Sequence, residues 1–399
     1  MPRQQPENEA SLYRPWGLSD SRRKAYAKSA RESAAAKAAA LRGEGPTPLH
    51  DVNCPKLDAS SLMKRRRRAP LSALSLFSGG GGLDLGYDLA GFQHVASYEW
   101  LAEGAATLSE ARPKWTVFGG EKGDVRTIDW SAFRGEIDVV HGGPPCQPFS
   151  AAGRQNGAMD PRDMVPEFTR AILEIRPRAF QMENVPALTQ KKFTTYIREL
   201  ILDPLSNDYE VQMFFLRAAD FGVPQTRRRV FFVGLRRDQS KKFAAPTPTH
   251  CWSHLTPSKT GAGDTNDHDL ADTNLPRTMG AREALGLPAI GIDRLAPTLR
   301  STLNGPRNTT SILSSTAAQR VWEGIQIWPN GVAADRESAR AFVAKNGHFR
   351  LSVADCALLQ GFPDSWPFQG PTYAALGQIG NAVPPPLAYA VAGALRKAL

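Results

Sequence analysis

The sequence predicts an α/β fold with a doubly wound, mostly parallel sheet and a second, smaller domain. Two observations support this prediction. From residue 71, short apolar segments rich in β-branched and aromatic residues alternate with loops and helical stretches, as in chains built from βαβ units. The apolar segments also lack a strict apolar–polar alternation, which is expected for strands buried on both faces.

The expected elements follow in order along this body. Strands are predicted at residues 73–78, 94–100, 115–118, 137–143 and 179–185, and helices near 83–90 and 163–175. Residues 209–218 and 229–237 predict an antiparallel hairpin, which departs late from the parallel pattern. Ser352 and Asp355 have the spacing of a capping box at the start of a short helix, and a last helix is expected over residues 386–399.

Charge and composition divide the chain into four parts. Residues 1–70 contain 15 Lys and Arg against 7 Asp and Glu, so this extension carries +8 of the formal charge of +10. Residues 71–237 form the body. Residues 238–346 are polar and rich in Pro and Gly, and they predict a second domain or a large insertion. Residues 347–399 return to the body.

The basic extension is predicted to be partly helical or disordered. Its Ala-rich stretch over residues 22–42 favours one helix with little apolar surface. Residues 64–68 have the sequence KRRRR. Three interpretations of the extension stay open: a solvated tail, an arm that contacts nucleic-acid phosphates, and a nuclear-import signal.

The composition also excludes several classes of protein. No apolar segment approaches the ~18 residues that a membrane span requires. The first ten residues lack the hydrophobic region of a secretory signal. The four cysteines are too scattered for a disulfide framework, and their spacing fits no zinc site. We therefore expect a cytoplasmic protein with no bound metal and no membrane attachment.

A glycine-rich turn follows the first predicted strand. Phe77 and Ser78 precede Gly79–Gly82, and a helix comes next. Glycines let a backbone approach a ligand closely, and a helix N-terminus favours negative charge. Glu99 ends the second strand, where a carboxylate can accept hydrogen bonds from both hydroxyls of a ribose. The dinucleotide fingerprint and the P-loop pattern are both absent, so S-adenosylmethionine fits better than NAD or ATP; a purely structural turn is the alternative.

A cysteine framed by prolines follows the fourth strand. Cys146 lies in Gly143-Pro144-Pro145-Cys146-Gln147-Pro148, and loops at this edge of a doubly wound sheet hold the ligand. Proline rings stiffen the loop, and an ionised thiol is a strong nucleophile. Cys146 is therefore the candidate nucleophile, whereas the other three cysteines are expected to be inert.

Two further groups of residues reach the same edge. Glu183 lies at the end of the fifth strand, where its carboxyl group can hold or deliver a proton on a substrate nitrogen. In the second arm of the hairpin, Arg227 and Arg229 would share one face while Arg228 points away. Two inward arginines suit a substrate carbonyl or phosphate; a solvated strand end is the alternative.

Together these residues resemble the DNA (cytosine-5)-methyltransferase family. The resemblance covers most of residues 71–237 and 293–399, and the proline-framed Cys146 with Glu183-Asn184-Val185 is its most specific part. The chain departs from the family at Ser75 and Leu101, where the family often has Asp. The other matching blocks are FSGGGG, Glu99-Trp100, Gly123-Asp124-Val125, Gln225 to Arg229, residues 350–363 and Gly380-Asn381-Ala382-Val383.

The resemblance implies an S-adenosylmethionine-dependent methyltransferase fold and the activity of a DNA (cytosine-5-)-methyltransferase. It implies that Cys146 attacks C6 of a flipped-out cytosine and that Glu183 binds the exocyclic amine and N3. C5 then takes the methyl group, and loss of the C5 proton and of Cys146 releases the product. Arg229 would contact O2, and Arg227 would support the loop around Cys146.

The resemblance also implies a set of cofactor-binding residues. Phe77 and Trp100 would sandwich the adenine, and Asn381 and Val383 would close the methionine side. The complete set is Phe77, Ser78, Gly79, Gly81, Gly82, Glu99, Trp100, Asp124, Val125, Pro145, Asn381 and Val383.

For the parts of the chain, the resemblance implies catalytic segments at 71–237 and 347–399 and a target-recognition domain at 238–346. The expected partner is double-stranded DNA, read by a monomer of prokaryotic type at the nucleoid. A role in a restriction-modification system is expected; a cognate endonuclease would act separately, and its existence is left open. The target sequence is not predicted. A tRNA cytosine-5 methyltransferase and a DNA-binding regulator with the same fold are the alternatives.

Overall fold

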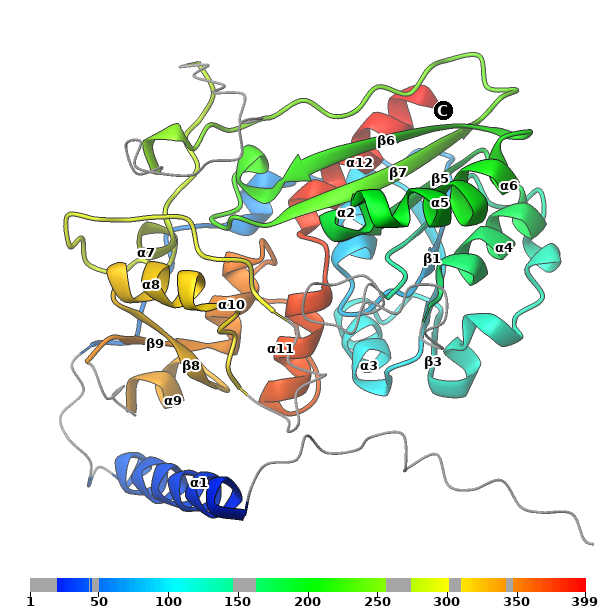
Figure 1. The fold of residues 1–399 in the computed structure, drawn as a ribbon. Coiled ribbons are helices and arrows are strands. Elements are labelled where there is room, and N and C mark those ends of the chain that lie inside the picture. Colours follow the sequence, from blue (N-terminus) through cyan, green and yellow to red (C-terminus); the bar gives the residue numbers. More distant parts are fainter. Residues whose placement is uncertain are drawn as a thin grey trace, which may run out of the picture.

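The computed structural model describes residues 20–42, 44, 50–145, 163–255, 274–300, 310–341 and 347–399 (Figure 1). Its central feature is a seven-stranded sheet with the order β3-β2-β1-β4-β5-β7-β6. The strands are β1 (Ser72–Leu76), β2 (Gln93–Glu99), β3 (Val117–Gly119), β4 (Val139–Gly142), β5 (Ala179–Asn184), β6 (Tyr209–Arg217) and β7 (Arg228–Arg236).

The pairing of these strands confirms the predicted fold class. Strands β3, β2, β1, β4 and β5 are all parallel. Strand β7 is antiparallel to both β5 and β6, so the predicted hairpin exists and lies at one end of the sheet. Because β7 reverses direction, its first residues come to the same edge as the last residues of β5.

Helices cover both faces of the sheet, and neighbouring residues of one strand enter different cores. Phe231 and Val233 of β7 pack with α2 and α12, whereas Val230 and Phe232 pack with α4 and α5. Figure 1 shows α2 and α12 side by side. The helices near the sheet are α2 (Gly82–Ala90), α3 (Ala102–Ala111), α4 (Val165–Ile175), α5 (Thr194–Ile197), α6 (Asp203–Leu205) and α12 (Pro385–Ala398).

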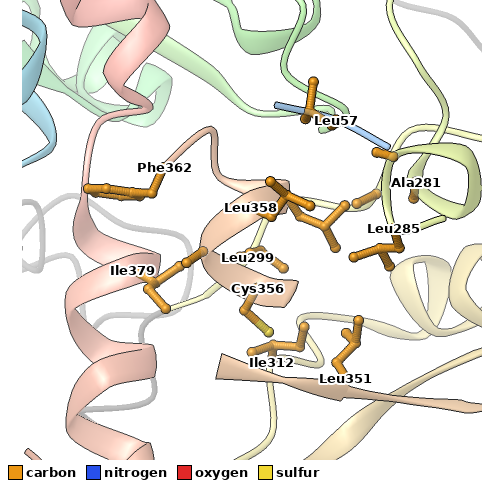
Figure 2. Packing of buried hydrophobic residues seen from close by; sticks show 14 of the residues in the cluster. Leu57, Ala281, Leu285, Leu299, Ile312, Leu351, Cys356, Leu358, Phe362 and Ile379 are labelled. Atoms are coloured by element: carbon orange, nitrogen blue, oxygen red, sulfur yellow. The ribbon is translucent and has the colours of Figure 1, made fainter. Parts of the chain in front are cut away.

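A second core lies beside the sheet, and Figure 2 shows part of it. Leu285, Leu299 and Ile312 meet Leu351 and Leu358 there. The elements around this core include the parallel pair β8 (Ile327–Ala333) and β9 (Phe349–Ser352), with α7 (Ala281–Ala284), α8 (Thr316–Gly324), α9 (Arg336–Ala341), α10 (Val353–Leu359) and α11 (Thr372–Asn381).

Local signals in the sequence are confirmed in this region. Ser352 accepts a hydrogen bond from the Asp355 backbone N–H, and Asp355 accepts one from the Ser352 N–H. This is the predicted capping box. Cys356 is fully buried, as expected for an inert cysteine.

The predicted basic helix is present as α1 (Asp20–Leu41), which lies near α9. The last part of the extension packs on the body. Leu57 and Met63 belong to the second core. Arg65 forms an ion pair of 2.9 Å with the buried Asp88 of α2, and Arg66 stacks on Tyr389 of α12, 4.9 Å from the ring centroid. The folded body therefore begins before residue 71.

The region between β5 and β6 contains an element that sequence patterns did not predict. Helices α5 and α6 are joined by a π-helical turn over Arg198–Leu202.

In the described part of the chain, no helix is both long and apolar enough to cross a membrane.

Candidate functional site

The candidate site lies where the parallel strands end. The glycine loop, residues 77–82, follows β1. Glu99 is the last residue of β2, and Gly143–Pro145 follow β4. Glu183 is near the end of β5 and pairs with Phe231 of β7. The sheet therefore brings the glycine loop, Glu99, residues 143–145 and Glu183 to one edge, because parallel strands share the edge at which they end.

Glu99 holds the glycine loop through its side chain. The Gly79 N–H donates to Oε2 at 2.6 Å, and the Leu101 N–H donates to Oε1 at 2.7 Å. Burial raises the pKa of Glu99, and the two backbone N–H groups oppose that rise. Ser78 forms a hydrogen bond of 2.8 Å with the buried Ser75, so the serine that departs from the family pattern supports the same loop.

Two glycines of the loop are required by its geometry. Gly81 has φ +84°, which side-chain-bearing residues rarely adopt. A Cβ on Gly82 would lie 2.1 Å from the carbonyl oxygen of Val383. The loop can therefore contact the block at 381–383 only because residue 82 is glycine. Val383 is buried, whereas Asn381 at the end of α11 is exposed.

Trp100, Asp124 and Arg126 form a group next to Glu99. The Trp100 side chain is 54% exposed, and the Arg126 guanidinium lies 5.7 Å from its ring centroid. Arg126 Nε and Nη2 donate to Asp124 Oδ1 and Oδ2 at 2.9 and 2.7 Å, and this pairing lowers the pKa of Asp124. Val125 is a core residue, and Phe77 packs against the same core.

Glu183 and Arg229 form an ion pair at the part of the candidate site where β5 and β7 meet. Arg229 Nε lies 2.8 Å from Glu183 Oε1, and both side chains are nearly buried. Oε1 forms no directed hydrogen bond in addition to this ion pair. Burial raises the pKa of Glu183, while Arg229 and Arg227 oppose the rise. A carboxyl group with a raised pKa therefore lies beside Arg229 at this edge of the sheet.

The loop that leads to the candidate nucleophile starts beside Glu183. A Cβ on Gly143 would lie 3.0 Å from Glu183 Oε2, so the glycine allows close approach. The Asn184 side chain donates to the Pro144 carbonyl at 3.3 Å, and Pro145 is half-buried. Cys146 itself lies outside the described residues.

The three arginines before and in β7 have different partners. Arg229 reaches Glu183, while the Arg228 guanidinium lies 4.4 Å from the ring centroid of Phe215. Arg227 is fully buried. Its Nη1 and Nη2 donate to the carbonyl oxygens of Leu299 and Gly380 at 3.3 and 2.9 Å.

Sequence reasoning missed two residues that lie next to the predicted cofactor-binding residues. Arg126 follows Asp124 by two positions, and an Asp–x–Arg spacing was the available signal. Trp366 donates from Nε1 to the Gly80 carbonyl at 2.9 Å, and Arg112 stacks 5.2 Å from one of its rings. Trp366 has no local signal because it is 286 residues from its partner.

Comparison with known proteins identifies the family. The family model described as C-5 cytosine-specific DNA methylase matches residues 71–397. The Type II methyltransferase M.NgoMIV of Neisseria gonorrhoeae is 35% identical over 329 residues, which cover 82% of this chain and 98% of that protein. The Type II methyltransferase M.NaeI of Lentzea aerocolonigenes is 33% identical over 331 residues, covering 82% and 75%.

A solved structure agrees at the level of the fold. A putative DNA modification methyltransferase encoded within an Escherichia coli prophage is 22% identical, with a TM-score of 0.51, and the match covers 82% of this chain and 99% of that one. The family match covers most of the chain, and the sheet has the strand arrangement that the resemblance implied. The chain therefore belongs to the C-5 cytosine-specific DNA methylase family and is a DNA (cytosine-5-)-methyltransferase.

Proposed function

We propose that this enzyme transfers a methyl group from S-adenosylmethionine to C5 of a cytosine within a specific sequence of double-stranded DNA. The nearly buried pair of Glu183 and Arg229 supports this proposal most. The pair lies beside Gly143–Pro145, at the same edge as the glycine loop and Glu99. A base and a methyl donor can therefore be held within reach of one another.

The residues at the glycine loop fit S-adenosylmethionine. Each carboxylate oxygen of Glu99 accepts one backbone N–H, and each keeps a lone pair for a ribose hydroxyl. The exposed ring of Trp100 offers a flat apolar face for the adenine. When bound, S-adenosylmethionine would supply the electrophilic methyl group on its sulfonium.

Each of the proposed catalytic residues acts on different atoms of the cytosine. The Cys146 thiolate adds to C6, which makes C5 nucleophilic. Glu183 holds a proton at N3 and accepts a hydrogen bond from the exocyclic amine, while Arg229 donates to O2. After methylation, the C5 proton passes to solvent and the C–H electron pair forms the C5–C6 double bond, while the Cys146 thiolate departs with the electron pair of the C6–S bond.

The buried site also requires that the cytosine leave the duplex. Flipping one base costs a few kcal/mol, and the contacts of the flipped base with Glu183 and Arg229 offset part of this cost. Residues 238–346 would read the flanking sequence, together with residues 347–362, which share the second core.

The biological setting follows from the relatives. M.NgoMIV and M.NaeI are named as Type II methyltransferases, which supports a role for this enzyme as the modification partner of a separately acting endonuclease. We expect a monomer that works on chromosomal DNA. The tRNA alternative and the regulator alternative are not retained, because the family match is to a DNA methylase.

Bisulfite sequencing of a host that expresses this chain tests the proposal. We expect conversion-resistant cytosines at one position of one sequence motif, and none above the empty-vector level with the Cys146→Ser variant. Resistance that is absent, or that persists in the Cys146→Ser variant, would contradict the proposed function.

A further inference from the structure

Three segments that are distant in the sequence meet next to the candidate site. They are the loop before β7, the strand-like segment around Ala296, and the junction between α11 and α12. Gln225 and Ala296 form a parallel β-bridge. The Thr226 N–H donates to the Ala296 carbonyl, and the Ala296 N–H donates to Pro224, both at 2.9 Å. The first two segments are therefore held together by backbone as well as by side chains.

Two buried glutamines connect these segments in series. The Leu299 N–H donates to Gln225 Oε1 at 3.3 Å. Gln225 Nε2 donates to Gln360 Oε1 at 2.8 Å, and Gln360 Nε2 donates to the Ala382 carbonyl at 2.6 Å. Both glutamines are fully buried. This series of hydrogen bonds starts at a backbone N–H and ends at a backbone carbonyl. The orientation of both side-chain amides is therefore fixed.

Arg227 provides a second connection between the same segments. It joins the Leu299 carbonyl to the Gly380 carbonyl. The N–H and the C=O of Leu299 are therefore both bound by residues of the loop before β7. A displacement of Leu299 would break several buried hydrogen bonds, which are costly to leave unmade in a low-dielectric interior.

Each end of the glutamine pair leads to a different part of the site. Leu299 belongs to the second core with Leu358 and Ile379, as Figure 2 shows. At the other end, Ala382, which lies at the border of the second core, packs with Val383 directly on Gly82 of the glycine loop. The pair therefore lies between the second core and the loop that would hold the cofactor.

We infer that Gln225 and Gln360 are positioning residues that couple the binding of target DNA to the binding of S-adenosylmethionine. This inference rests on the proposed function, in which the second core carries target recognition. When DNA fixes the second core, the amide chain fixes residues 382 and 383, and these set the glycine loop against the cofactor. Coupling of this kind is reciprocal, so the cofactor tightens DNA binding by the same factor.

The experiment measures the coupling factor directly. The probe is S-adenosylhomocysteine, titrated by calorimetry without DNA and with a saturating duplex that contains the motif found by bisulfite sequencing. We expect the duplex to tighten binding to the wild-type enzyme at least about fivefold, the lower end of usual coupling. In Gln360→Met and in Gln225→Met, the ratio of the two affinities should fall at least about twofold below the wild-type ratio, while the connection through Arg227 keeps part of the coupling. The double variant should lose no more coupling than either single variant, because both residues act in one series of hydrogen bonds.

Gln181→Met is the matched control. Gln181 is also fully buried and accepts a hydrogen bond of 2.8 Å from Tyr87, but it does not connect the segments described above. We expect it to lower the melting temperature and to leave the coupling factor as in the wild type. A purely structural role for Gln360 predicts the same pattern for Gln360→Met.

A second variant covers the case in which Gln360→Met does not fold. Gln360→Glu keeps the size and accepts from Gln225, but it places an oxygen against the Ala382 carbonyl. We expect it to weaken the coupling as well. A wild-type ratio near one, or an unchanged ratio in the folded variants, overturns the inference. Failure of the proposed function would look different, since the wild-type enzyme would then bind no S-adenosylhomocysteine or methylate no motif.

Discussion

Arg229 and Glu183 form an ion pair of 2.8 Å in which the two side chains are only 12% and 9% exposed. The charge of Arg229 opposes the effect of burial on Glu183, yet burial dominates and the pKa of Glu183 is raised. A buried carboxyl group beside an arginine is suited to exchange a proton with a base that enters the site. This relationship gives the first prediction.

Replacing Glu183 by Gln should lower the rate of methyl transfer much more than the affinity for the cofactor. The amide cannot supply a proton to N3, and acid–base help of this kind is worth about 10²–10⁴ in rate. Single-turnover methylation and calorimetry with S-adenosylhomocysteine measure the two effects separately. A rate within about twofold of the wild type would give Glu183 another role.

Replacing Cys146 by Ser should abolish methyl transfer and preserve DNA binding. The thiolate forms the proposed adduct, whereas phosphate and base-edge contacts come from other residues. A duplex with 5-fluorocytosine at the target position should trap the wild-type enzyme in a denaturation-resistant complex when the cofactor is present. A trapped complex that still forms with Cys146→Ser would refute the assignment of the nucleophile.

Replacing Arg126 by Ala should weaken cofactor binding by a few fold. The substitution removes both hydrogen bonds to Asp124 and the stacking contact with Trp100. Arg126 is about half exposed, so the pair contributes no more than about 1 kcal/mol. Arg126→Lys keeps the charge but not the planar fork, and we expect it to fall in between. Equal affinity of all three proteins in calorimetry would show that this group does not shape the adenine side.

Deletion of residues 1–49 and deletion of residues 1–70 should have different effects. The shorter deletion removes α1 and leaves the packed segment from residue 57 in place, so the melting temperature should change little. The longer deletion removes Leu57 and Met63 from the second core. It also removes the ion pair between Arg65 and the buried Asp88. Burial raises the pKa of Asp88, and Arg65 and Arg112 together lower it, so the deletion removes part of the charge that stabilises this buried carboxylate. We expect a clear loss of thermal stability only for the longer deletion.

The shorter deletion also tests the basic arm. Residues 1–49 contain nine Lys and Arg against five Asp and Glu. If the arm engages three or four phosphates, the log–log salt dependence of DNA binding should become shallower by roughly three. The methylated motif should stay the same, because base readout is proposed for residues 238–346. A changed motif would show that the recognition surface is elsewhere, and an unchanged salt dependence would show that the arm does not contact DNA.

Acid should destabilise the enzyme partly through His141. Burial lowers the pKa of this residue of β4 from 6.5 to about 4. The unfolded chain therefore binds more protons between these values, and the contribution of His141 is present above pH 6.5 and is lost as the pH falls toward 4. Between pH 7 and pH 5 the loss is at most about 2 kcal/mol. Urea denaturation at both pH values should show a smaller difference for His141→Gln, and an equal difference would contradict the assignment.

The sequence alone predicted the elements that depend on local patterns. The apolar segments placed β1, β2, β4 and β5 and the hairpin of β6 and β7, and the capping box placed the start of α10. From these, the carboxyl ends of the parallel strands brought Glu99 and Glu183 to one edge. Strand burial, caps and turns are set by residues within a few positions of each other, and a single sequence displays them.

Only the tertiary structure decided which distant groups meet. Gln360 contacts Gln225, which is 135 positions away in the sequence, and Trp366 contacts Gly80, which is 286 positions away. Arg65, which the sequence placed in the basic extension, forms an ion pair with Asp88 of the body. No periodicity or short motif records such pairs, because they arise from the way separate elements pack. The sequence by itself determined the family, the sheet and the candidate residues at the edge of the sheet. Packing determined how the second core, the glycine loop and the basic segment are joined. The reason is that a buried polar group requires a hydrogen-bond partner, which the fold supplies from any part of the sequence.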